Sequence, residues 1–339
     1  MRDISNKIDC KKLPTPVNIS VLQFYLHNYD RNERKFILSG FSEGFSVSCD
    51  KSTCNLECKN LLSANQQPGI VKDTICKELV ADRFAGPFLS PPFDNFTVSP
   101  LGLCPKKESN KFRLIHHLSY PKGNSVNDCI AKEFSSVQYT QITDVIAGIK
   151  KFKSPCYLAK TDISMAYRHL PLKPEEYHLF GFRWNSLYYY DKCLPMGCAS
   201  SCQMFERFST GLHWIGQSFM LQGVMFHILD DCLIVAQTKE LTDYNLKTFL
   251  HICKEIGIPM APDKTIGPDT SITFLGIELD TVKQEARLPQ DKLSKCLEII
   301  CEFLHRKKVT LKELQSLCGL LNFACQVVIP GRAMFTPPF

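Results

Sequence analysis

The sequence lacks the features that mark several large classes of protein. It contains no apolar run that approaches the length of a membrane span, no internal repeat and no long low-complexity tract. Its first residues, MRDISNKIDCKK, lack the apolar stretch of a signal peptide. Charge is nearly balanced, because 40 Lys and Arg residues face 34 Asp and Glu residues for a net charge of +6. This mildly basic balance permits a polyanionic partner without requiring one, and we expect no membrane partner.

Cysteine, by contrast, is plentiful, with 17 residues scattered along the chain. An odd number of cysteines without an apolar leader favours reduced thiols, so we expect an intracellular protein, cytoplasmic or nuclear. Cys49, Cys54 and Cys58 form a local cluster, but they lack a C-x2-C pair and a nearby histidine. Incidental cysteines are therefore favoured over a zinc site at this position.

The hydrophobic pattern predicts a mixture of strands and helices. The 339 residues are 44% hydrophobic and 22% charged, an ordinary globular composition with room for two or three domains or one multi-lobed domain. Ser200 and Gln203 match an S-x-x-Q capping box, and apolar residues recur at helical spacing after them. Residues 246–256 repeat the helical pattern before Gly257, and ITFLGIEL (residues 272–279) predicts a strand.

The C-terminal segment, residues 283–339, carries most of the net charge, with nine Lys or Arg and five Asp or Glu. An amphipathic helix is predicted by its apolar stripe, which consists of Leu293, Cys296, Leu297, Ile300, Cys301 and Leu304. Thr310 and Glu313 predict the capped start of another helix. A solvated helical face is the simplest interpretation of the charge. Beside a catalytic site, the same cations become candidates for contacts with a phosphate backbone.

The stretch FHILDDCLIV (residues 226–235) places two adjacent aspartates, Asp230 and Asp231, inside an apolar run. Two ionised carboxylates repel each other, and burying them is costly without a compensating cation. The run is too short and too β-branched for a good helix, so we predict two strands with the aspartates at the turn of a hairpin. A DD pair is most often a polar turn and nothing more. Here both flanks are apolar, and Asp162 ends an earlier predicted strand.

If the strand that ends at Asp162 pairs with this hairpin, three carboxylates meet at one end of a sheet. Carboxylate oxygens suit Mg²⁺, which keeps some of its waters and shares substrate phosphates. Two such ions roughly 4 Å apart activate an attacking oxygen and stabilise a leaving oxygen in phosphoryl transfer. Asp162, Asp230 and Asp231 therefore predict a divalent-metal site for phosphoryl transfer.

Several motifs follow one another along the chain: FRLIHHLSYPKGNSVND, TDISMAYRHLPL, LPMGCASSC, ILDD, GIPMAPDKT, ITFLGIEL and LQSLCGLLNFACQVVIPGRA. This ordered set resembles the reverse transcriptases, and among them those of DIRS-type retrotransposons, which integrate by a tyrosine recombinase. The resemblance covers roughly residues 60–335. It implies an α+β right-hand polymerase fold with fingers, a palm built on an antiparallel sheet, and a helical thumb. The implied domains are an N-terminal extension (1–85), fingers and palm (86–282), and a helical thumb or connection (283–339).

The resemblance also implies an activity and its participants. It implies an RNA-directed DNA polymerase that extends a primer 3′-hydroxyl on an RNA or DNA template, with deoxynucleoside triphosphates as substrates. Two Mg²⁺ ions, with Mn²⁺ as an alternative, would be bound by Asp162, Asp230 and Asp231, and Lys264 would approach the leaving pyrophosphate. Nucleotide contacts are implied for Lys106, Lys107, Arg113, Tyr167, Met196 and Gly197. Primer contacts are implied for Phe274, Leu275 and Gly276.

The chain departs from the family pattern in three places, none of which removes a metal ligand. Ile228 stands where a tyrosine is usual before x-DD, Met196 is the variable residue of LP-x-G, and Cys202 replaces an expected proline. A catalytically weak or inactive nucleic-acid-binding protein of the same fold is therefore the main alternative. A metal nuclease is a second one, although the basic pair and Tyr167 argue against it. Because RNase H, methylase-like and recombinase domains belong to a full element, we expect a fragment or a truncated copy. The oligomeric state stays open.

Overall fold

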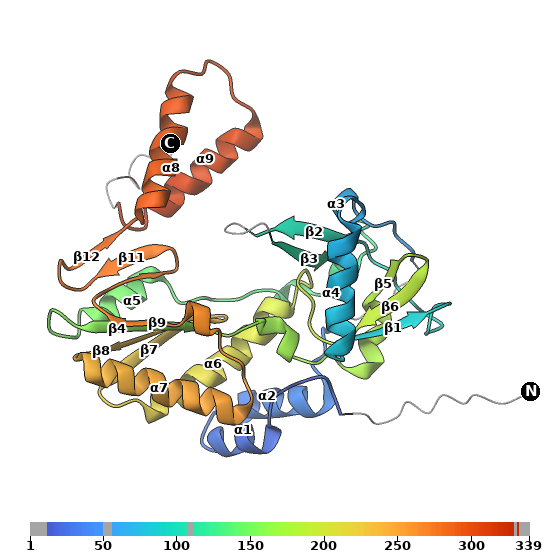
Figure 1. Ribbon diagram of the computed structural model, residues 1–339, viewed down its shortest axis with the longest axis horizontal. Helices are drawn as coiled ribbons and strands as arrows, with labels where there is room; N and C mark the ends of the chain where they lie inside the picture. The colour runs from blue at the N-terminus through green and yellow to red at the C-terminus, as the bar shows by residue number, and fades with distance from the viewer. Residues whose placement is uncertain (1–11, 50–55, 107–110, 329–330, 332–339) are drawn as a thin grey trace, which may run out of the picture. The chain divides into compact units, whose positions relative to one another are not determined.

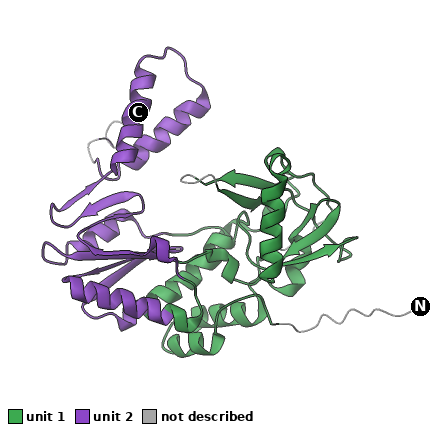
Figure 2. Ribbon diagram, viewed as in Figure 1, with its two compact units in different colours: residues 1–138, 163–215, 253–259 green, residues 139–162, 216–252, 260–339 purple. Residues whose placement is uncertain are grey.

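The computed structural model describes residues 12–49, 56–106, 111–328 and 331. The chain divides into two compact units, each assembled from separate stretches of sequence (Figure 2). Unit 1 comprises residues 1–138, 163–215 and 253–259, and unit 2 comprises residues 139–162, 216–252 and 260–339. Helices and antiparallel strands occur in both units, as expected for an α+β protein (Figure 1).

Unit 2 is built around a four-stranded sheet in the order β7-β8-β4-β9. Its strands are β4 (Tyr157–Asp162), β7 (Gly223–Ile228), β8 (Asp231–Ala236) and β9 (Ile266–Asp269). Strands β7 and β8 form the predicted hairpin, and β4 pairs antiparallel with β8 as the carboxylate argument requires. The register runs from Tyr157 opposite Ala236 to Asp162 opposite Asp231.

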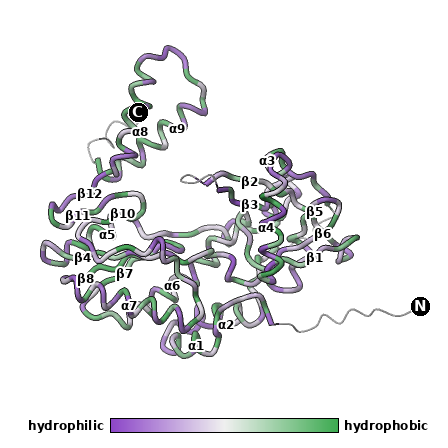
Figure 3. Tube along the Cα trace, in the orientation of Figure 1, coloured by the Kyte–Doolittle hydropathy of each residue, from purple (hydrophilic) through white to green (hydrophobic). Residues whose placement is uncertain are grey.

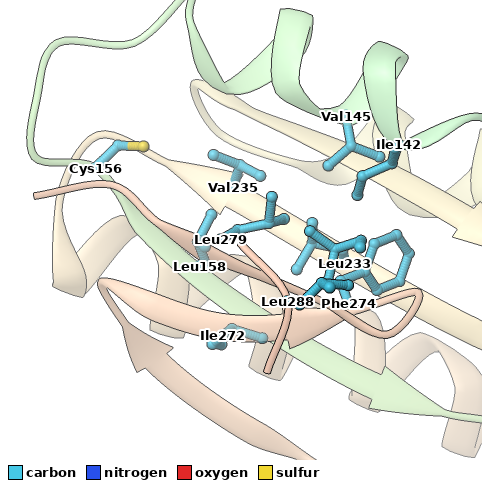
Figure 4. Close-up of a cluster of buried hydrophobic side chains, with 11 residues drawn as sticks. Ile142, Val145, Cys156, Leu158, Leu233, Val235, Ile272, Phe274, Leu279 and Leu288 are labelled. Carbon is cyan, nitrogen blue, oxygen red and sulfur yellow. The ribbon is translucent and has the colours of Figure 1, made fainter. Parts of the chain in front are cut away.

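One face of this sheet carries the main hydrophobic cluster of unit 2 (Figure 4). Leu158, Leu233 and Val235 lie on that face, because side chains alternate along each strand. They pack against α5 (Ile142–Ile149) and against a second sheet formed by β10 (Ser271–Phe274), β11 (Ile277–Asp280) and β12 (Glu285–Arg287). The second sheet therefore covers the sheet face on which Asp162 and Asp231 also lie.

The prediction of a single strand over residues 272–279 is wrong, because these residues form the β10–β11 hairpin. Leu275 and Gly276 make its two-residue turn, with φ values of 51° and 74°. Positive φ at both central positions is what a tight hairpin turn between twisted strands requires. Leucine rarely adopts this conformation, so the apolar pattern concealed the turn.

The other face of the sheet is covered by α7 (Lys239–Ile256) and by the end of α6 (Ser201–Phe219). Thr242 on α7 donates from its hydroxyl to the carbonyl of Tyr157 at 3.3 Å, and Gly216 on α6 lies close to the ring of Phe249. Helix α6 matches the sequence prediction, whereas α7 begins at Lys239, seven residues before the predicted Leu246. The residue after α7 is Gly257, with φ of 88°, which suits its predicted role as a C-terminal cap.

Two helices, α8 (Gln290–Leu304) and α9 (Leu311–Ala324), follow β12. Thr310 and Glu313 form the predicted capping box, and hydrophobic and hydrophilic residues intermix along both helices (Figure 3). The predicted stripe is not fully buried: Cys296 is, whereas Leu297 and Leu304 are 54% and 76% exposed. The helices form as predicted, but much of their apolar surface stays accessible within this chain.

Unit 1 contains a three-stranded sheet, a two-stranded ribbon and several helices. The sheet has the order β1-β6-β5, with β1 (Phe84–Phe88), β5 (Gly181–Trp184) and β6 (Leu187–Asp191), and the ribbon pairs β2 (Leu101–Pro105) with β3 (Phe112–His116). Helices α3 (Leu62–Gln66) and α4 (Pro68–Val80) share one hydrophobic cluster with these strands. Short 3-10 turns follow β3 and β4, at Val126–Cys129, Lys132–Phe134, Ala166–His169 and Pro174–Leu179.

The remaining helices of unit 1, α1 (Ile19–Tyr25) and α2 (Arg31–Glu43), pack near the first part of α6. Phe41 on α2 stacks edge-on against Phe208 of α6 with ring centroids 5.1 Å apart. Much of the predicted N-terminal extension, residues 1–85, thus contributes α1 to α4 to unit 1. Among the described residues, no helix is both long and apolar enough to cross a bilayer.

We expect Leu158→Ala to lower the free energy of unfolding by about 2–5 kcal/mol, because Leu158 is fully buried in the cluster of unit 2. The matched control is Leu311→Ala on α9, where the leucine is 72% exposed and the change should stay within about 0.5 kcal/mol. Urea-induced unfolding measures both values. Equal effects of the two substitutions would contradict the assignment of this cluster as the core of unit 2.

Candidate active site

Three carboxylates gather at one end of the central sheet of unit 2. Asp162 is the last residue of β4 and lies directly opposite Asp231, the first residue of β8. Asp230 occupies the turn between β7 and β8, after Leu229 with φ of 51°. A positive φ at a branched residue is uncommon and marks backbone strain of the kind found at functional sites. The sequence prediction of a hairpin tip beside a third acid is confirmed.

The electrostatics of this cluster reflect crowded negative charge. The pKa of Asp231 is raised to about 6, first by burial and then by the charges of Asp230 and Asp162. The ammonium of Lys264 bonds Oδ2 of Asp162 at 2.8 Å. Burial acts to lower the pKa of Lys264, but the bond to Asp162 and the nearby carboxylates outweigh it and raise the pKa above its ordinary value.

The donor set suits a hard divalent cation, since a positive charge beside Asp231 would relieve the crowding by Asp230 and Asp162 that raises its pKa. Within the described ranges, however, no group of three or more His, Cys, Asp or Glu side chains is arranged to hold a metal ion as it stands. The ammonium of Lys264 compensates Asp162 in this structure, and metal binding by Asp162, Asp230 and Asp231 stays a prediction.

Sequence reasoning missed two supports of the cluster. Lys160 lies two residues before Asp162 on the same face of β4, donates to the carbonyl of Thr273 at 3.0 Å, and acts to lower the pKa of Asp231. The carbonyl of Asp162 accepts from the backbone N–H of Ala261 at 2.8 Å, and Lys264 in turn bonds the carbonyl of Ala261. Alternation along β4 could have revealed Lys160, whereas the bond from Ala261 spans 99 residues and leaves no local signal.

Tyr167 belongs to unit 1, on the 3-10 turn Ala166–His169. Its ring packs edge-on against Phe205 of α6, with centroids 5.3 Å apart, and its hydroxyl lies 3.3 Å from the sulfur of Cys202. Cys202 is the residue that departs from the expected proline. The ring of Tyr167 is thus held by two side chains from the first turns of α6.

Met196 and Gly197 lie in the turn that leads into α6. Gly197 has φ of 121°, and a Cβ there would overlap the carbonyl oxygen of His116, so glycine is required. Asn127 fixes the turn by donating to the carbonyl of Gly197 and accepting from the N–H of Ala199, both at 2.8 Å. Helix α6 starts beside Ser200 as predicted, while the amide of Gln203 donates to the carbonyls of residues 133 and 136.

The predicted phosphate-binding cations lie on the ribbon of β2 and β3. Arg113 pairs with Cys104 across the ribbon, and the backbone N–H of Lys106 bonds the carbonyl of Lys111. Alternation puts the exposed side chains of Lys106, Lys111 and Arg113 on one side of the ribbon. Lys111 was not predicted, although the same alternation could have identified it. Lys107 lies outside the described residues.

The three residues predicted to contact a primer sit at the β10–β11 turn of unit 2. Phe274 is 2% exposed and packs inside the hydrophobic cluster, so its side chain anchors the turn instead of facing solvent. Leu275 and Gly276 form the turn itself. Lys292 of α8 donates to the carbonyl of Gly276 at 3.0 Å, and its ammonium lies 4.3 Å from the ring centre of Phe323. No local pattern around Lys292 predicts this contact.

Comparison with protein families gives one match, a model described as reverse transcriptase (RNA-dependent DNA polymerase), over residues 104–279. The Pro-Pol polyprotein of feline foamy virus is 28% identical over 234 residues, which are 68% of this chain and 18% of that protein. Polyprotein P3 of Commelina yellow mottle virus is 24% identical over 221 residues, 65% of this chain and 10% of that protein. Protein P of duck hepatitis B virus is 27% identical over 183 residues, with shares of 52% and 22%. The chain thus spans about a tenth to a fifth of these relatives.

Solved structures show the same fold at low sequence identity. The foamy viral protease-reverse transcriptase in complex with double-stranded DNA matches with a TM-score of 0.67 at 15% identity, over 94% of this chain and 56% of that one. Its complex with an RNA/DNA hybrid matches with a TM-score of 0.64 at 16% identity, over 94% of this chain and 43% of that one. The predicted fold class, an α+β right-hand polymerase fold, is confirmed.

Without metal, we expect the free energy of unfolding to fall as the pH rises from 3.8, the ordinary pKa of an aspartate, to about 6. The folded state holds the Asp231 proton more tightly than the unfolded state, so ionisation of this residue disfavours folding. Asp231→Asn should remove this pH dependence, and Asp263→Asn at an exposed position should preserve it. Unfolding midpoints in the presence of a chelator, measured across this pH range, provide the test. A profile unchanged by Asp231→Asn would contradict the crowding described above.

Proposed function

The chain belongs to the reverse transcriptase (RNA-dependent DNA polymerase) family, and from this premise we propose that it is an RNA-directed DNA polymerase. It would extend a primer 3′-hydroxyl on an RNA or DNA template, with deoxynucleoside triphosphates as substrates. The observation that carries the proposal is the pairing of Asp162 with Asp231, beside Asp230 in the hairpin turn. A strained turn that gathers carboxylates at a sheet end suits phosphoryl transfer better than it suits structural support.

Asp162 and Asp230 would hold two Mg²⁺ ions, or Mn²⁺ in their place, with Asp231 beside them. The chemistry that such ions supply when bound is activation of the primer hydroxyl and stabilisation of the departing pyrophosphate. Lys264 would then release Asp162 and approach the pyrophosphate. This exchange is feasible because the Lys264 side chain is 56% exposed, while the Asp162 carboxylate, 7% exposed, would keep a cation partner in the bound ions.

The remaining residues would bind nucleotide and primer. Lys106 and Arg113, joined by Lys111 on the same side of the ribbon, would contact the triphosphate, because cations attract its charge. Lys107 would join them, as the resemblance implies. Tyr167 would pack beside the sugar, and the turn of Met196 and Gly197 would form the floor of the nucleotide site. The β10–β11 turn, at Leu275 and Gly276, would position the primer, with Phe274 anchoring it from the core.

We further infer that the chain derives from a DIRS-type retrotransposon and acts inside the cell, in the cytoplasm or nucleus. The support is the motif set that resembles this group, in particular FRLIHHLSYPKGNSVND and LQSLCGLLNFACQVVIPGRA. The relatives named above are viral proteins, so the retrotransposon origin rests on these motifs. Genomic sequence that flanks the coding region tests it, because a tyrosine recombinase reading frame is expected there.

A second candidate function is nucleic-acid binding without catalysis. Two observations favour it: Ile228 and Cys202 depart from the family pattern, and Lys264 occupies Oδ2 of Asp162. The two functions differ in one measurable outcome. A polymerase extends a primer on an RNA template in the presence of Mg²⁺, whereas a binding protein retains the primer and template without extending them.

We expect the unmodified protein to extend a primer on an RNA template, and Asp162→Asn or Asp230→Asn to abolish measurable extension. Each substitution keeps the shape of the side chain but removes a charge that a divalent cation needs. Affinity for primer and template should be retained, since carboxylates do not attract phosphates. Asp243→Asn on the surface of α7 is the matched control and should extend normally. Binding by the unmodified protein without extension would favour the non-catalytic function.

We expect Tyr167→Ala to retain deoxynucleotide incorporation but to raise ribonucleotide incorporation sharply relative to it. A ring packed beside the sugar leaves no room for a 2′-hydroxyl, and a displaced sugar disturbs the reacting geometry. Tyr167→Phe is the matched control, because it keeps the ring and its contact with Phe205. Single-nucleotide extension with each nucleotide type measures the discrimination ratio. If that ratio is the same in all three proteins, Tyr167 serves packing and not selection.

A further inference from the structure

Arg168, the residue after Tyr167, forms an unusually dense set of contacts in unit 1. Its side chain is 12% exposed, so the guanidinium is largely withdrawn from solvent. It donates to Glu78 from Nε at 3.0 Å and from Nη2 at 2.7 Å. Its Nη1 donates to Asp191 at 2.7 Å and to the carbonyls of Cys193 and Leu194, both at 3.3 Å.

These contacts join three stretches that are distant in sequence, around residues 78, 168 and 191–194. Glu78 lies on α4, Asp191 ends β6, and residues 193 and 194 begin the turn that contains Met196 and Gly197. Asp191 strengthens the connection, because its other oxygen accepts the N–H of Cys193 at 3.0 Å. Backbone bonds run beside the guanidinium, from the N–H of Leu194 to the carbonyl of Leu170 at 2.9 Å.

The place of Arg168 in the chain gives these contacts a functional meaning. Arg168 belongs to the same 3-10 turn as Tyr167. Its guanidinium donates a hydrogen bond to the carbonyl of Leu194, two residues before Met196. The guanidinium therefore links the Tyr167 turn to the Met196–Gly197 turn, alongside the backbone bond from Leu194 to Leu170. Asn127 holds the far side of the second turn through the carbonyl of Gly197. Arg168 restrains the near side.

We propose that Arg168 is a positioning residue for nucleotide selection. It holds the ring of Tyr167, the wall beside the sugar, and the Met196–Gly197 turn, the floor of the nucleotide site, at a fixed separation. This inference rests on the proposed polymerase function, because that function assigns the wall and the floor. Arg168 is buried among protein groups and acts through its neighbours. The role requires arginine in particular, since a planar guanidinium presents five donors in a rigid fork.

Substitution by lysine separates the positive charge of Arg168 from its hydrogen bonds to the carbonyls of Cys193 and Leu194. Arg168→Lys keeps a positive charge between Glu78 and Asp191, so neither carboxylate is left without a buried cation. A single ammonium has three donors on one atom and cannot reach Glu78, Asp191 and both carbonyls together. The substitution should therefore loosen the 193–197 turn while the fold is retained.

The chain provides a matched control in Arg83. Its guanidinium donates to the same carboxylate, Glu78, from Nε and Nη2, both at 2.9 Å. In the described part of the chain, that guanidinium donates to no carbonyl of residues 192–197. Arg83→Lys thus makes the same chemical change in the same ionic cluster without altering the restraint on the turn.

The test is single-nucleotide extension with deoxynucleotides and ribonucleotides, with KM and kcat measured separately. For Arg168→Lys we expect the deoxynucleotide KM to rise about 10-fold and discrimination against ribonucleotides to fall about 10-fold, because small displacements of a binding wall are costly. The kcat at saturating nucleotide should stay within about threefold, since the carboxylates lie on other elements. Arg83→Lys should leave both KM and discrimination within about twofold of the unmodified protein.

A second measurement keeps this inference separate from the polymerase activity. Methionine methyl groups labelled with ¹³C report the surroundings of Met196, whose signal Met196→Leu identifies by its loss. Arg168→Lys should shift that signal, and Arg83→Lys should leave it in place. If the unmodified protein fails to extend any primer, the proposed function fails while the methyl signal still tests the restraint. Equal effects of the two lysine substitutions on KM, discrimination and the methyl signal would overturn the positioning role.

Discussion

The antiparallel register between β4 and β8 is the constraint on which the candidate site depends. Pairing Asp162 with Asp231 puts both carboxylates on one face of the sheet, at the end of a row that includes Leu158, Leu233 and Val235. A slip of one residue would turn every side chain of one strand to the other face. The buried apolar residues therefore fix the register that brings the carboxylates together, and their burial offsets the repulsion between them.

The structure compensates negative charge in two physically different ways. At the carboxylate cluster, Lys264 reaches Asp162 with one exposed ammonium, and such a bond is readily replaced by another cation. In unit 1, Arg168 meets Glu78 and Asp191 while buried, and removing it would leave the buried carboxylate of Asp191 without its cation. The first arrangement suits a site that exchanges cations during a reaction. The second suits a permanent support.

Sequence predicted the features that depend on local pattern. The β7–β8 hairpin followed from an apolar run interrupted by two acids, and the start of α9 followed from Thr310 and Glu313. The β10–β11 turn was missed, because Leu275 adopts a positive φ that its residue type disfavours. The contact of Arg168 with Glu78 joins residues that are 90 positions apart, and neither the spacing nor the composition of the sequence predicts such a contact.

The same distinction explains which parts of the site were predictable. The candidate carboxylates stand at strand ends, where alternation and turn chemistry leave a visible signature in the sequence. The side chains that restrain turns follow no such pattern. Asn127, Lys292 and Arg168 each donate to a turn carbonyl that the fold brings near them, at positions that no sequence spacing predicts. These side chains donate to backbone carbonyls that have no partner within a helix or a sheet. Such carbonyls occur in turns, so each of the three side chains lies beside a turn. Polar side chains thus restrain the irregular turns of each unit, while the register of the sheet in unit 2 brings the candidate carboxylates together.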